Sequence, residues 1–118
     1  MGAFKIAPTL LKLTNFGILS HAFAGKTEKS NVDVYSGKDL QNAGKKLGIG
    51  CISVTPTTVE AVDSPDDVVR LVEKLFERTG EENIAYVHPD CGLKASPPNI
   101  VEKILENLQR GVGILRDQ

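Results

Sequence analysis

Hydrophobic and polar positions along this chain predict helices and strands in turn. Apolar residues recur at helical spacing over residues 6–13, from Pro65 to Gly80, and from Ser96 to Leu108. Short apolar runs at 16–20, 49–54 and 84–87 lie between these stretches and are typical of buried strands. A modest further helix is predicted from Ser36 or Asp39 toward Lys46, after a polar loop at 26–36.

The resulting order is helix, strand, helix, strand, helix, strand, helix. Strands that are separated by helices favour a parallel sheet built by right-handed crossovers. The strand candidates lack a clean alternation of apolar and polar residues, as expected when both faces of a sheet are covered. The sequence therefore predicts an α/β fold with a short parallel sheet.

The strongest local signal is the start of the third helix. Ser64 offers a capping hydroxyl, Pro65 suits the first helical position, and Asp66 and Asp67 oppose the helix dipole. We expect a helix that starts at Pro65 and ends at Gly80.

Residues with reactive side chains follow the last predicted strand, in the stretch from His88 to Lys94. Cys91 comes just past the strand, with Asp90 before it. Because the loops after parallel strands converge at the carboxyl edge of the sheet, catalytic and binding groups collect there. Cys91 is the obvious chemical group of such a site.

Composition excludes several classes of function. The 118 residues suit one domain, and a net charge of −1 provides no broad basic surface for nucleic acid. No apolar stretch reaches the roughly 20 residues of a membrane span. The chain has two cysteines, Cys51 and Cys91, far apart and without CxxC spacing, which indicates reduced thiols in a cytoplasmic protein. The glycines form no GxGxxG fingerprint for a dinucleotide.

Three segments resemble the end of the catalytic domain of cobalamin-independent methionine synthase. They are residues 47–54, the helix at 64–78 and, above all, the PDCGLK loop within 86–94, and the resemblance runs from about residue 18 to 116. In that family the PDCGL loop follows the last strand of a TIM (β/α)8 barrel. The resemblance implies that Cys91 is a ligand to a catalytic zinc. It also implies methyl transfer to homocysteine in methionine biosynthesis, from a methylated folate or a methyl-corrinoid protein.

The chain also departs from the family pattern. The family supplies two further zinc ligands as a His-x-Cys pair, which this sequence does not contain. Another family ligand is a glutamate, and the matching position is His21, a second candidate metal ligand. The family's proton-transferring histidine matches Thr55, which is no acid near neutral pH.

Other residues have competing interpretations. Asp90 is a candidate for binding the substrate amine, or else it caps the backbone of its own loop. His88 and Cys91 form a His-x-x-Cys spacing, which the family does not use for zinc. Cys51 lies within a predicted strand and is expected in the core.

Length limits what the chain holds. A complete (β/α)8 barrel takes about 250 residues, so residues 1–118 are expected to form a single partial-barrel domain. Its unpaired strand edges predict association into a homo-oligomer, or with a missing N-terminal barrel segment. Two alternatives to the methyltransferase stay open: a non-catalytic structural or regulatory relative, and a corrinoid-linked barrel methyltransferase of the uroporphyrinogen-decarboxylase type.

Overall fold

The computed structural model describes residues 7–12, 17–24 and 31–117 and confirms the alternation of helices and strands. In chain order the main elements are α1 (Ala7–Lys12), β1 (Ile18–Ala22), α2 (Gly37–Ala43), β2 (Lys46–Ile52), α3 (Pro65–Thr79), β3 (Ile84–Pro89) and α4 (Pro98–Arg116). Short 3₁₀ turns are η2 (Asn31–Asp33), η3 (Val59–Ala61) and η4 (Glu81–Asn83).

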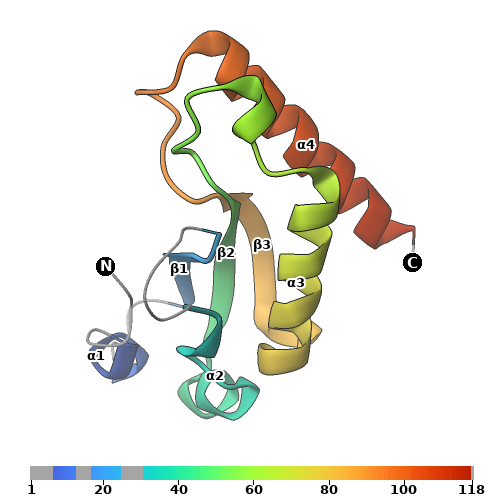
Figure 1. Ribbon diagram of the computed structural model, residues 1–118. Helices are drawn as coiled ribbons and strands as arrows, with labels where there is room; N and C mark the ends of the chain where they lie inside the picture. The colour runs from blue at the N-terminus through green and yellow to red at the C-terminus, as the bar shows by residue number, and fades with distance from the viewer. Residues whose placement is uncertain (1–6, 13–16, 25–30, 118) are drawn as a thin grey trace.

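The three described strands form one parallel sheet, as predicted, and their order in the sheet is β1-β2-β3. Their carboxyl ends point toward the top of Figure 1, where the loops before α3 and α4 begin. The pairing register of β2 with β3 shifts between Gly50 and Ile52, so Cys51 lies at an irregularity of the ladder.

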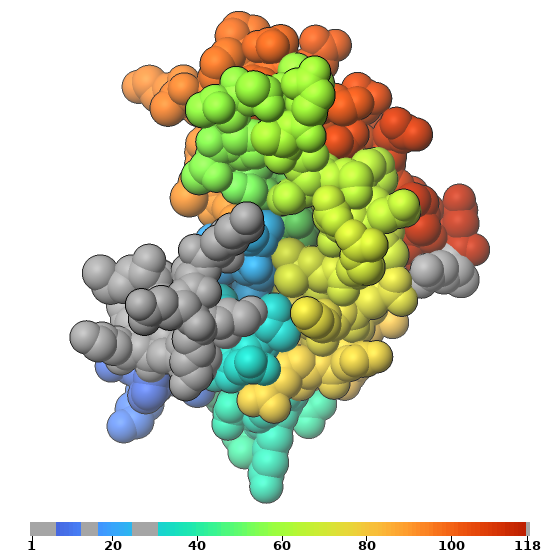
Figure 2. All heavy atoms as spheres, in the orientation of Figure 1, coloured from blue at the N-terminus to red at the C-terminus, as the bar shows by residue number. Residues whose placement is uncertain are grey.

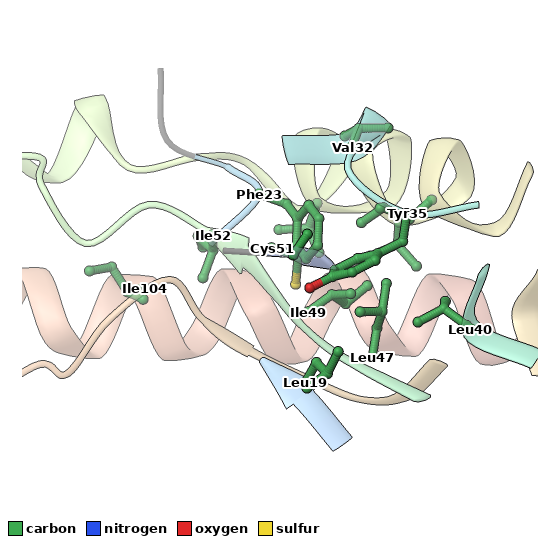
Figure 3. Packing of buried hydrophobic residues seen from close by; sticks show 14 of the residues in the cluster. Leu19, Phe23, Val32, Tyr35, Leu40, Leu47, Ile49, Cys51, Ile52 and Ile104 are labelled. Carbon is green, nitrogen blue, oxygen red and sulfur yellow. The ribbon is translucent and has the colours of Figure 1, made fainter. Parts of the chain in front are cut away.

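One face of the sheet carries the hydrophobic core. Leu47 and Ile49 of β2 are fully buried in the same cluster as Val72 of α3 and Ile104 of α4. Figure 3 shows aromatic side chains of Phe23 and Tyr35 in this cluster beside the strand residues. Burying apolar surface at about 25 cal/mol per Å² makes this layer the main source of stability.

The opposite face is more open. Tyr86 of β3 is 46% exposed, and its hydroxyl lies 2.8 Å from Oγ of Ser20 on β1. This hydrogen bond crosses β2 above Gly48, where a Cβ would approach the Tyr86 ring to 2.6 Å. Glycine inside a strand commonly marks such a close approach.

The start of α3 agrees with the sequence. Ser64 Oγ accepts the amide of Asp67 at 3.1 Å, and the Asp67 carboxylate accepts the amide of Ser64 at 2.9 Å. The helix ends at Thr79, just before Gly80. The reciprocal pair is a capping box, in which each partner satisfies an otherwise orphaned amide.

The expected extension of the second helix to Lys46 is wrong. A capping box of Ser36 and Asp39 starts α2, but the helix ends at Ala43 because Gly44 adopts a left-handed conformation, with φ of 66°. Lys46 instead begins β2 and pairs with Ile18.

Strand boundaries also differ from the sequence prediction. β2 ends at Ile52 rather than at residue 54, because the amide of Ser53 donates to the Asp63 carboxylate at 2.9 Å and leaves the ladder. β1 runs on to Ala22, so His21 lies inside the strand and does not follow it. Residue 16, in the predicted first strand, lies outside the described residues.

The loops before α3 and α4 lie together at the upper end of the molecule (Figure 2). Asn107 of α4 donates to the carbonyl of Asp63 at 2.9 Å, and Ser96 Oγ donates to the carbonyl of Val54 at 3.4 Å. Among the described helices, none combines the length and apolar character needed to cross a membrane.

Candidate metal and substrate site

Cys91 directly follows β3 and Asp90, at the carboxyl edge of the sheet. Its thiol is free and its side chain is exposed, whereas Cys51 is buried. The exposed thiolate of a cysteine is a metal ligand and a nucleophile, so Cys91 is the reactive one of the two.

Asp90 ties the Cys91 loop to the ends of the other two strands. Its backbone amide donates to the carbonyl of Ile52 at 2.9 Å, and its Oδ1 accepts the amide of Ala24 at 3.3 Å. The carboxyl group also packs on Gly50, where a Cβ would lie 2.8 Å from Oδ1. The carboxylate therefore accepts a hydrogen bond from the segment after β1, on the far side of β2. Substrate binding by Asp90 stays a prediction.

His21 turns toward the core face of the sheet, in register with Ile49. Its Nε2 lies 2.8 Å from the Tyr35 hydroxyl, and its ring contacts that of Phe23 edge-on. Burial lowers the pKa of His21, and burial also raises the pKa of Tyr35 to about 12. Burial therefore favours the neutral form of this histidine, and one of its ring nitrogens is already in a hydrogen bond with Tyr35.

Cys51 is a core residue, as expected. It is 1% exposed, and burial, followed by the charge of Asp90, raises the pKa of its thiol to about 12 (Figure 3). A thiol in this state does not ionise near neutral pH and is inert.

Hydroxyl groups follow β2. Thr55 Oγ1 lies 3.0 Å from Oγ of Ser53, and the Thr55 amide donates to the same Oγ at 3.3 Å. These contacts fold the exit of β2 back on itself, and they give Thr55 a local structural role.

Sequence reasoning did not single out the Ser20–Tyr86 pair. The signal for it is Gly48, because a glycine between two strand neighbours leaves room for side chains to meet across it. The pair is a fixed polar feature of the open face, beside the His88 ring, whose centroid is 5.6 Å from that of Tyr86.

The donors for zinc are only partly present. Zinc takes thiolate and imidazole ligands, and a catalytic site needs about three from the protein. Within residues 7–12, 17–24 and 31–117, no three His, Cys, Asp or Glu side chains form a group able to hold a metal ion. Cys91 fits as one donor, and the bond to Tyr35 occupies Nε2 of His21. The described residues therefore fit part of a zinc coordination sphere.

Comparison with known proteins places the chain in a family. The profile described as the catalytic domain of cobalamin-independent synthase matches residues 20–112. A methionine synthase from Methanothermobacter marburgensis is 35% identical over 91 residues, which are 77% of this chain and 27% of that protein. One from Methanothermobacter thermautotrophicus is 32% identical over 96 residues, 81% of this chain and 29% of that protein.

The fold has a solved counterpart. A B12-independent methionine synthase from Shewanella sp. W3-18-1, in complex with selenomethionine, superposes with a TM-score of 0.72 at 20% identity. The match covers 96% of this chain and 30% of that one. At this identity the likeness concerns the fold, and it confirms the expected correspondence to part of a (β/α)8 barrel.

The chain spans less than a third of the length of each of these relatives. Its match to the family profile nevertheless runs from within β1 through α2, β2, α3 and β3 into the last helix, α4, and includes the PDCGLK loop. The chain therefore belongs to the cobalamin-independent methionine synthase family, and it corresponds to a part of that family's catalytic domain.

Proposed function

We propose that this chain contributes one rim of the active site of an enzyme that transfers a methyl group to the thiol of homocysteine. The observation that carries the proposal is the exposed Cys91 thiol, at the carboxyl edge of a parallel sheet in a methionine synthase fold. Membership of the family supports the reaction class, and the edge is where catalytic groups of barrel enzymes collect.

Cys91 would hold zinc as a thiolate ligand in this scheme. When bound, zinc is a Lewis acid that lowers the pKa of a substrate thiol and keeps it as a nucleophilic thiolate at neutral pH. The methyl group comes from a methylated folate or from a methyl-corrinoid protein.

Asp90 sets the position of this ligand. Its amide is fixed to Ile52 and its carboxylate to Ala24, so the residue next to the thiol is held on two sides. A loop held in this way orders Cys91 before the ion binds, which lowers the entropy lost on binding. An additional contact of the Asp90 carboxylate with the substrate amine belongs to the same proposal.

The full chain provides the test. Zinc content after dialysis and the consumption of homocysteine with each methyl donor are measured for the wild type, Cys91→Ser and Ser96→Ala. Ser96 lies in the same loop, so its variant is the matched control. We expect Cys91→Ser to lose both bound zinc and turnover while Ser96→Ala keeps them. A wild type without zinc and turnover, or equal zinc in the two variants, would overturn the proposal.

A further inference from the structure

A hydrogen bond between two side chains crosses the open face of the sheet. The Ser20 hydroxyl on β1 and the Tyr86 hydroxyl on β3 lie 2.8 Å apart. They meet above Gly48 of β2, where a Cβ would lie 2.7 Å from Ser20 Oγ and 2.6 Å from Cε2 of Tyr86. The bond therefore depends on glycine at this position, and through it β1 holds the Tyr86 ring in place.

The Tyr86 ring in turn supports the ring of His88, two residues further along β3. The two ring centroids are 5.6 Å apart, and the ring planes are inclined at 50°. Alternate residues of a strand point to the same face, so His88 lies beside Tyr86 on the open face. The register partner of His88 on β2 is Gly50, which has no side chain. Tyr86 therefore supplies a ring contact that orients the imidazole.

The imidazole holds the chain where it leaves β3. Nδ1 of His88 lies 2.6 Å from the carbonyl oxygen of Pro89. A carbonyl oxygen only accepts hydrogen bonds, so Nδ1 carries a proton and donates it. The other end of the same peptide unit is the Asp90 amide, which donates to the carbonyl of Ile52 at 2.9 Å. Because a peptide unit is planar, a hydrogen bond at each end fixes its orientation.

Cys91 follows directly from this fixed peptide unit. The Asp90 carboxylate, between the peptide unit and the thiol, accepts the amide of Ala24 at 3.3 Å. The backbone of Cys91 thus starts from a residue that is held at its amide and at its side chain, whereas its own side chain is exposed. The direction in which the Cys91 thiol points is therefore set by the residues before it.

We propose that His88 is a positioning residue, which places the Cys91 thiol by donating its Nδ1–H to the carbonyl of Pro89, with Tyr86 and Ser20 as its support. The proposal rests on the proposed function, in which Cys91 acts in the reaction. Functional groups must be held to within about 0.5 Å by the residues around them, and a displacement of about 1 Å can slow a reaction by about a hundredfold.

Two amide side chains distinguish the two nitrogens of the His88 ring. Asparagine and glutamine both carry an N–H donor. The amide nitrogen of asparagine is the same number of bonds from Cα as Nδ1 of histidine, and that of glutamine is the same number as Nε2. Nε2 of His88 is buried and has no hydrogen-bond partner among the described residues. We therefore expect His88→Asn to keep the function of the ring and His88→Gln to lose it.

Hydrogen exchange of backbone amides, followed by NMR on the full chain, measures whether the loop is held. The Asp90 amide reports the loop, and the Gly80 amide, which donates to Phe76 at 2.9 Å, reports the end of α3. We expect the exchange rate at Asp90, divided by that at Gly80, to rise about fivefold in His88→Gln, as loss of one hydrogen bond predicts. The ratio should stay within about twofold of wild type in His88→Asn.

Two further sets of variants complete the test. Ser20→Ala and Tyr86→Phe remove the same hydrogen bond, so each should raise the ratio, and the double variant should raise it no further. Ser64→Ala, which removes the cap of α3, is the control for a general loss of stability and should leave the ratio unchanged. Homocysteine consumption should fall roughly tenfold in His88→Gln and stay within about threefold of wild type in His88→Asn.

The outcomes separate this inference from the proposed function. Equal exchange ratios in His88→Asn and His88→Gln contradict the positioning role, and so does wild-type turnover in His88→Gln. A loss in His88→Asn alone would assign the ring's role to Nε2 and to a ligand instead. If the wild type neither binds zinc nor consumes homocysteine, the proposed function fails, and the exchange ratios still decide whether His88 holds the loop.

Discussion

Replacing Gly50 by alanine should destabilise the protein by crowding the junction of all three strands. A Cβ there would lie 2.9 Å from the His21 carbonyl oxygen, 2.8 Å from Asp90 Oδ1 and 2.9 Å from Asp90 Cα. Two of these atoms belong to the backbone of neighbouring strand ends, so rotation of a side chain cannot relieve the contact. Overpacking of this kind costs about 1–3 kcal/mol.

The same change should displace Asp90 from its bond to Ala24, at a further cost of about 1 kcal/mol. The total of roughly 2–4 kcal/mol is a large part of the about 5–15 kcal/mol that stabilises an ordinary domain. Urea unfolding followed by circular dichroism measures it. With a slope of about 1–3 kcal/mol per M, we expect the midpoint to fall by on the order of 1–2 M.

Two other glycines provide controls. A Cβ at Gly92, in the Cys91 loop, or at Gly113, within α4, meets no atom within 4 Å. Gly92→Ala should stay within about 0.5 kcal/mol of wild type, and Gly113→Ala should gain about 0.5–1 kcal/mol from helix propensity. If Gly50→Ala unfolds at the wild-type midpoint, the close approach of Asp90 to β2 is refuted.

Four further outcomes are expected. Burial lowers the pKa of His21, so as the pH falls below about 6.5 the unfolded chain binds a proton on this residue more readily than the folded chain does. The contribution of His21 to the free energy of unfolding is therefore complete above that pH and is lost below it. His21→Gln should make the free energy of unfolding less dependent on pH in urea titrations at several pH values. Cys91 should react with a thiol reagent at once and Cys51 only on unfolding, because burial raises the pKa of Cys51 to about 12, and equal rates would contradict this. Ser64→Ala should cost about 1 kcal/mol through loss of the cap on α3, whereas Thr58→Ala, at an N-cap without a side-chain bond, should cost little in the same unfolding assay. Ile18 and Tyr86, 45% and 46% exposed, should promote association of the chain, and a sedimentation profile that is monomeric at every micromolar concentration would count against it.

Sequence pattern predicted the elements better than their ends. The cap at Ser64 and the apolar stripe of α3 are local signals, and both appear in the structure as expected. Gly44, which adopts the left-handed conformation, is an equally local signal for the end of α2. The basic residues after it are not typical of a strand, so the pattern did not predict that β2 starts there. Strand ends depend on partners elsewhere in the chain. Lys46 belongs to β2 because Ile18 lies opposite it in β1, and Ser53 does not belong to it because its amide donates a hydrogen bond to Asp63.

The sequence by itself determined the α/β order, the family and the location of a reactive thiol at Cys91, because hydrophobic period, capping residues and the PDCGLK motif are all read over a few neighbouring positions. Only the tertiary structure decided which way each histidine faces. Side chains alternate across a strand, so extending β1 through His21 commits that ring to the core face and to Tyr35. The same alternation sets His88 beside Tyr86, and the carbonyl of Pro89 fixes its proton and leaves Nε2 without a partner among the described residues.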